Sequence, residues 1–67
     1  MLIHNNLYVS ALIKRINVDI NPNSQYLNKI ARITCVSSSE IDILYLFNNA
    51  RFTYHMYQYE RFELLEP

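Results

Sequence analysis

The side chains that could do chemistry in this chain include one cysteine and two histidines. As a nucleophile Cys35 would need a neighbouring base, and as a zinc ligand it would need several His or acidic partners. It alternates with Ile33 and Ala31 on an apolar face, a pattern that favours a buried structural thiol. No serine or carboxylate has a spacing that pairs it with His55, and nothing in the spacing supports a metal site made of Cys35, His4 and His55. We therefore expect no catalytic residue, no cofactor and no metal.

The carboxylates do not form an acid and base pair either. They fall at the ends of extended runs or at polar positions, as solvated charges do: Glu40, Asp42, Glu60 and Glu63. The chain has no glycine, which removes every phosphate-binding loop, because those loops need a backbone without Cβ against the phosphate. A core this small also leaves little room for a substrate pocket. The sequence therefore predicts a non-enzymatic protein with no small-molecule substrate.

The length of 67 residues allows one small domain, residues 1–67, and such a domain buries only about 60% of its unfolded surface. A single cysteine cannot form an internal disulfide, so any additional stabilisation of this kind must come from association with a second chain. The first residues lack both a basic leader and a long apolar run, and no stretch approaches the roughly 18 apolar residues of a membrane span. We expect a cytoplasmic protein with no membrane partner.

The formal net charge is zero, which is unfavourable for nonspecific nucleic-acid binding because that binding depends on phosphate neutralisation. The basic residues precede an acidic end of the chain, however, so a local basic face remains an alternative. Its members would be Lys14, Arg15, Lys29, Arg32 and Arg51. In that alternative Tyr57 or Tyr59 would stack on bases, as aromatic residues do in small single-strand binders.

Asparagine takes the place of glycine at the expected turns, since it tolerates positive φ better than other residues. The turns are expected at Asn5-Asn6, Asn21-Pro22-Asn23 and Asn48-Asn49. Residues 16–20 alternate apolar and polar at period two, which indicates a strand. Residues 7–15 fit either a continuation of that strand or a short helix, and we favour one strand from about residue 7 to 20.

Three further runs, residues 29–36, 41–47 and 51–59, alternate in the same way and are separated by short polar loops. They predict an antiparallel meander, followed by a last apolar pair in residues 62–65 that returns against the sheet. The expected inward residues are Ala31, Ile33, Cys35, Ile41, Ile43, Tyr45, Phe47, Phe52, Tyr54 and Met56.

The aromatic run also leaves residues that this core does not use. If residues 51–59 stay extended, His55, Tyr57 and Tyr59 share the outer face, a large amphipathic surface for so small a domain. Alternatively the chain bends into a helical turn at Tyr57, so that Tyr57 or Tyr59 covers the open end of the sheet. Leu44 and Leu46 are apolar residues on the outer face of their strand, which must be covered by the N-terminal segment or by another chain.

The order of strand, polar loop, strand, Asn turn, strand and final FELL resembles the small barrels of the SH3-like class, which includes KOW and Tudor domains. The resemblance covers roughly residues 16–65 and departs from the class in having no glycine at a corner. It implies an all-β fold, either an SH3-like barrel or a strongly bent antiparallel sheet of about five strands, with a short helical turn near residues 57–62. It also implies a binding module. The short length of the chain and its composition, rich in Ile, Asn and Tyr, are similar to those of small accessory proteins of bacteriophages and other mobile elements.

The expected function is therefore protein binding, as an adaptor or inhibitor of a larger host protein or as a homo-oligomer. The candidate binding residues are Tyr57, Tyr59, His55, Arg51, Leu44 and Leu46. If the chain is encoded by a phage, it would act in the host cytoplasm.

Overall fold

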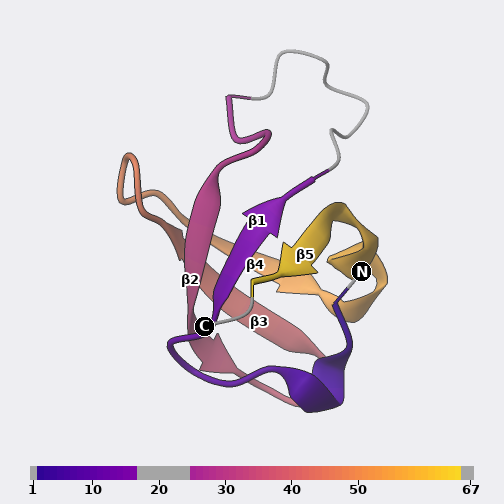
Figure 1. The fold of residues 1–67 in the computed structure, drawn as a ribbon. Coiled ribbons are helices and arrows are strands. Elements are labelled where there is room, and N and C mark those ends of the chain that lie inside the picture. The colour runs from indigo at the N-terminus through magenta and orange to yellow at the C-terminus, as the bar shows by residue number, and fades with distance from the viewer. Residues whose placement is uncertain (1, 17–24, 66–67) are drawn as a thin grey trace.

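The computed structural model describes residues 2–16 and 25–65, which form one antiparallel sheet. Its strands are β1 (Leu12–Arg15), β2 (Ile30–Val36), β3 (Glu40–Tyr45), β4 (Arg51–His55) and β5 (Phe62–Leu64). They lie in the order β4-β3-β2-β1-β5 (Figure 1). Two 3-10 helices accompany them, η1 (His4–Asn6) and η2 (Met56–Arg61). The all-β fold of five strands and the short helical turn near the end are confirmed.

Strands β2, β3 and β4 form the predicted meander. Residues 37–39 connect the first pair, and Ser37 donates its backbone N–H to the Glu40 carbonyl across that loop. Asn49 adopts a positive φ of 60° in the second loop, which confirms the turn expected at Asn48-Asn49. Asn28 and Ser10 also have positive φ, at turns that the sequence did not predict. The expected turn at residues 21–23 lies outside the described residues.

Strand β1 is shorter than predicted. The strand expected from about residue 7 begins only at Leu12, because a turn at residues 9–10 precedes it and Ser10 takes φ 82° there. The later part of the expected strand, residues 17–20, lies outside the described residues. Strand β5 pairs with β1 through Lys14 and Glu63, so the predicted return of the last apolar residues against the sheet is confirmed.

The two outer strands of the sheet approach each other. Helix η2 joins β4 to β5, and the rings of Tyr54 and Phe62, one from each strand, lie 4.8 Å apart between centroids. Since β4 and β5 are at opposite ends of the strand order, the sheet must be strongly bent. Neither 3-10 helix is long and apolar enough to cross a membrane, and no other helix occurs among the described residues.

The inner face of this bent sheet carries the core. It includes most of the residues that were predicted to point inward: Ala31, Ile33, Ile41, Ile43, Tyr45 and Tyr54. Three other predicted core residues are exposed, and the prediction was wrong for them. Phe47 lies in the turn beyond β3, and Met56 begins η2 rather than extending β4. Phe52 lies on the inner side of β4, beside which the described part of the chain places no further strand.

Cys35 is also exposed, although its alternation with Ile33 predicted burial. The register between β2 and β3 shifts between these two residues: Ile33 pairs with Ile43, whereas Cys35 pairs with Asp42. This irregularity inserts one extra residue, so that Thr34 and Cys35 both come to lie on the outer side. Val36, opposite Ile41, returns to the core side.

We expect the Cys35 thiol to react with a disulfide reagent in the native protein at nearly the rate measured in urea, because folding does not cover it. Stopped-flow absorbance of the released thiolate measures both rates. If the thiol reacts at least roughly a hundredfold more slowly in the native protein than in urea, Cys35 is buried, as simple alternation predicts, and the exposed position is wrong.

Candidate functional site

Tyr57 is the most exposed large apolar or aromatic residue that the structure describes, with 75% of its surface open to solvent. Two reciprocal hydrogen bonds cap the start of the turn that carries it. His55 Nδ1 accepts the backbone N–H of Tyr57 at 3.5 Å, and the side-chain oxygen of Gln58 accepts the backbone N–H of His55 at 2.9 Å. The rings of His55 and Tyr57 also contact each other, with centroids 4.6 Å apart. Tyr57 is therefore an exposed aromatic side chain held on a fixed backbone.

Tyr59, predicted on the same outer face, is instead buried, with only 2% of its surface exposed. The prediction assumed that β4 continues, but the chain enters η2 at Met56 and the period-two alternation ends there. The Tyr59 hydroxyl lies 3.0 Å from His4 Nδ1, and its carbonyl accepts the backbone N–H of Leu2. Burial, and secondarily the charge of Glu40, raise the pKa of Tyr59. The alternative in which Tyr59 packs inward from a helical turn is the one observed.

Arg51 and Leu44 lie side by side on the outer face of the sheet, as direct partners across β3 and β4. On its other side Leu44 faces Arg32 of β2 and is half-buried. Leu46, just beyond the end of β3, is exposed. Arg51 and His55 are four positions apart along β4, about 13 Å at the rise of an extended strand. We call Leu44, Arg51, His55 and Tyr57 the hairpin surface.

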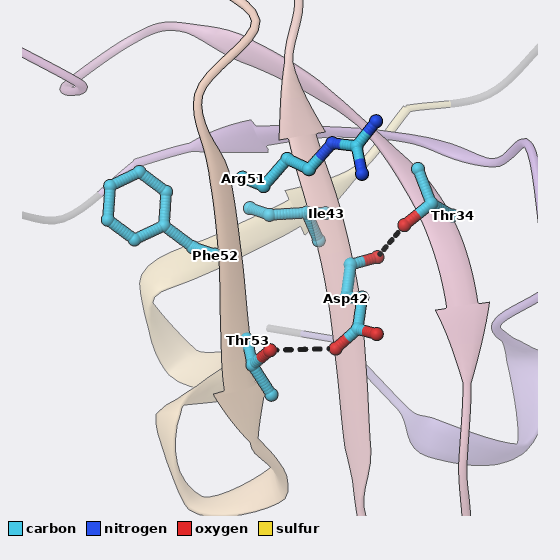
Figure 2. A pocket seen from close by; sticks show the side chains of 6 residues that line it. All are labelled: Thr34, Asp42, Ile43, Arg51, Phe52 and Thr53. Carbon is cyan, nitrogen blue, oxygen red and sulfur yellow. Dashed lines mark hydrogen bonds between the residues drawn. The ribbon is translucent and has the colours of Figure 1, made fainter.

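The middle of the hairpin surface is polar and slightly hollowed (Figure 2). Thr53 donates its hydroxyl to the Asp42 carboxylate at 2.8 Å, and Thr34 donates to the Asp42 backbone carbonyl at 3.2 Å. In Figure 2 the Arg51 side chain extends over β3 toward Thr34, whereas the ring of Phe52 points away from it. The open hollow of about 310 Å³ therefore offers hydroxyl groups and a guanidinium to a polar group of a partner.

The predicted basic face is divided by the structure. Lys14, Arg32 and Arg51 share the outer face, but Lys14 lies directly opposite Glu63. Lys29 lies elsewhere, with its ammonium 5.1 Å from the centre of the Phe47 ring. Arg15 is buried, with 5% of its surface exposed, so its place in a nucleic-acid face was predicted wrongly.

Arg15 occupies the centre of the core instead. Its guanidinium donates to the hydroxyls of Tyr45 at 3.3 Å and Tyr54 at 3.0 Å. It also lies over the rings of Tyr54 and Phe62, 5.7 and 5.5 Å from their centroids. Burial raises the pKa of Tyr45 far above its ordinary value of 10, although the bond from Arg15 acts in the opposite direction.

A second group of aromatic side chains, around Tyr26, was not predicted from the sequence. The ring of Tyr26 contacts those of Tyr45, Phe52 and Phe47 at centroid distances of 4.4, 5.1 and 5.6 Å. Phe47 and Phe52 remain partly exposed at 47% and 37%, so one side of this group is open to solvent. Tyr26 stands outside all the predicted strands, and only its apolar neighbour Leu27 could have suggested that it packs.

No group of three metal-ligating side chains occurs within residues 2–16 and 25–65. His4 Nδ1 is hydrogen-bonded to the Tyr59 hydroxyl, and the exposed Cys35 lies on the outer face of β2.

Replacing Arg15 with Lys should lower the free energy of unfolding by roughly 1.5–3 kcal/mol, because the compact ammonium cannot keep the bonds to the two hydroxyls and also replace the planar guanidinium over the two rings. The matched variant Arg32→Lys, at an exposed position of β2, should change it by no more than about 0.5 kcal/mol. Urea denaturation followed by far-ultraviolet circular dichroism gives both values. Equal effects of the two substitutions would contradict a structural role for the buried guanidinium.

Alkaline pH should destabilise the fold, because the raised pKa of Tyr45 keeps its hydroxyl protonated in the folded state while the unfolded chain loses the proton. This contribution to stability is complete below about pH 10 and is lost as the pH rises further. In Tyr45→Phe the decline of unfolding free energy should be shallower by up to about 1.4 kcal/mol per pH unit. Urea titrations between about pH 9 and pH 11 measure the two slopes, and parallel slopes would contradict the assignment.

Comparisons of the chain with protein-family models, with curated proteins and with solved structures gave no match. Its function is therefore inferred from the geometry of the surface described above.

Proposed function

We propose that this chain is a non-enzymatic protein-binding module that binds a larger protein through the hairpin surface, as an adaptor or an inhibitor. The observation that carries the proposal is Tyr57, a large aromatic side chain that is 75% exposed on a turn whose start is closed by a capping box. Leaving such a side chain in water gains nothing for the fold. A partner that covers it gains apolar burial at little conformational cost, because the backbone beneath it is already ordered.

The other residues of the hairpin surface suit the same role. Tyr and Arg are the residue types that contribute most often to binding hot spots, and Arg51 lies on the outer face of β4 together with His55, whose ring contacts Tyr57. Leu44 is half-buried between Arg51 and Arg32, and Leu46 is exposed next to it. The surface thus combines an aromatic side chain, a guanidinium and aliphatic area, as the centres of protein interfaces do.

An SH3-like barrel is part of the proposal. It is supported by the meander β2-β3-β4, by the 3-10 turn between β4 and β5, and by the return of β5 onto β1. Members of that class commonly bind peptides or larger assemblies without catalysis. The short Ile-, Asn- and Tyr-rich composition supports a mobile-element accessory protein whose partner is a host protein in the cytoplasm.

Nucleic-acid binding is the second candidate, favoured only by the shared outer face of Lys14, Arg32 and Arg51. The burial of Arg15, the pairing of Lys14 with Glu63 and the zero net charge all weigh against it. It requires an affinity that falls steeply with salt.

Tyr57→Ala should abolish capture of the partner by the tagged protein in an extract of its host, while the free energy of unfolding changes by no more than about 0.5 kcal/mol. Tyr8→Ala is the matched control, because Tyr8 is also an exposed tyrosine but lies in the segment before β1, away from the hairpin surface. It should leave capture intact. Quantitative mass spectrometry of the captured proteins, with urea denaturation of each variant, provides the two readouts.

Treating the extract with nuclease separates the two candidate functions. Protein binding predicts capture that survives nuclease and is lost in Tyr57→Ala. Capture that disappears with nuclease, or in the double variant Arg32→Ala and Arg51→Ala but not in Tyr57→Ala, would replace the proposal with nucleic-acid binding.

A further inference from the structure

Strand β4 is an edge of the sheet, and its backbone shows which groups that edge leaves open. Tyr45 donates its backbone N–H to the Ala50 carbonyl, and Met56 donates to the Ser39 carbonyl. Both bonds share the register in which Ile43 pairs with Phe52 and Asp42 pairs with Thr53. Because hydrogen-bonded and non-hydrogen-bonded pairs alternate along an antiparallel ladder, Phe52 bonds to β3 while Arg51 and Thr53 direct their N–H and C=O groups away from it.

No strand lies beside that edge among the described residues, since β4 ends the strand order. Arg51 and Thr53 are exposed, and so is Phe52 between them. The next outward N–H, that of His55, is already taken by the Gln58 side chain. The open length is therefore defined: it starts at Arg51 and is closed at His55 by the capping turn that also carries Tyr57.

The side chains along this edge specify what could pair with it. On the inner side Phe52 is more than a third exposed, and Tyr54 follows it as a buried residue. On the outer side stand Arg51, Thr53 and His55. Since successive residues of an added strand point to opposite faces, its inner residues would meet an apolar row and its outer residues a row that begins with a cation.

We propose that the partner contributes an extended segment that pairs as a further strand with Arg51–Thr53, with apolar residues facing Phe52 and an acidic residue beside Arg51. This inference rests on the proposed protein-binding function and adds the mode of recognition. The backbone of β4 supplies hydrogen bonds that do not depend on the sequence of the segment. Phe52 supplies the preference for apolar residues, and Arg51 supplies the preference for acidic residues at the alternate positions once its side chain, which lies over β3 in Figure 2, turns toward the edge.

A second copy of the chain fits the same edge less well. Antiparallel pairing of two β4 strands centred on Thr53 places Arg51 of each copy opposite His55 of the other. The strand contains no acidic residue to meet Arg51, so the pairing lacks a countercharge. An acidic segment from another protein supplies what a second copy lacks.

The test uses a displayed library of random peptides selected on the immobilised protein, with Thr53→Pro and Thr53→Val as a matched pair. Proline removes the outward N–H without breaking a bond to β3, which edge strands tolerate. Valine keeps that N–H, and both substitutions remove the hydroxyl that bonds Asp42. We expect enriched peptides in which apolar and acidic residues alternate, binding at least about tenfold weaker to Thr53→Pro than to Thr53→Val.

Amide hydrogen exchange of the native protein provides a measurement that needs no variant, should Thr53→Pro fail to fold. A selected peptide should slow exchange at Arg51 and Thr53 by at least about tenfold and leave Phe52 little changed, because its amide already bonds to β3. Peptides without a period-two pattern, or unchanged exchange at both residues, would overturn the added strand.

The outcomes also separate this inference from the proposed function. Peptides whose binding is lost in Tyr57→Ala but equal in the two Thr53 variants would leave protein binding in place and refute strand pairing. Selection of no peptide would count against both. A homodimer in sedimentation equilibrium that dissociates in Thr53→Pro but not in Thr53→Val would make a second copy the occupant and overturn the acidic segment.

Discussion

The fold depends on a cation placed where small proteins normally put only hydrocarbon. The Arg15 guanidinium, carried by β1, bonds hydroxyls on β3 and β4 and lies over a ring on β5. A buried charge is tolerated only when its hydrogen-bonding capacity is met, so the two tyrosines must keep their positions for the core to form. One side chain thereby links four of the five strands. In a domain with little apolar surface to bury, such a link specifies the curvature of the sheet as well as its stability.

The aromatic composition follows from the same arrangement. Tyrosine offers a ring for packing and a hydroxyl for Arg15, which phenylalanine would lack, and Tyr45 and Tyr54 use both. The ring of Tyr26 extends the packing from Tyr45 toward the surface, where Phe47 and Phe52 are only partly covered. The aromatic run is thus neither one core nor one binding patch. Its side chains range from the buried tyrosines that contact Arg15 to the exposed Tyr57.

Local alternation predicted the strands well where pairing is regular. Ile41, Ile43 and Tyr45 follow the period of two because the extra residue of the irregularity belongs to β2, so that β3 itself stays regular and keeps a constant register with β4. Alternation failed at Cys35 because the bulge depends on how β2 meets β3, which no short window of sequence contains. Of the site, the candidacy of Tyr57 was predictable from the sequence. The helical turn that carries it was one of the two conformations predicted for residues 51–59. Arg15 could not be placed, because the partners that make its burial possible lie 30 and 39 residues away.

The contact of His4 with Tyr59 joins residues 55 positions apart. Leu2 reinforces it by donating its backbone N–H to the Tyr59 carbonyl, so that the first described residues are bound to η2, late in the chain. A contact of such sequence separation closes a long loop of the chain, which costs loop-closure entropy. The turn that presents Tyr57 is therefore coupled to the first residues of the chain: a ligand that steadies this turn also holds the N-terminal segment in place, and release of that segment weakens the ligand's hold to the same degree.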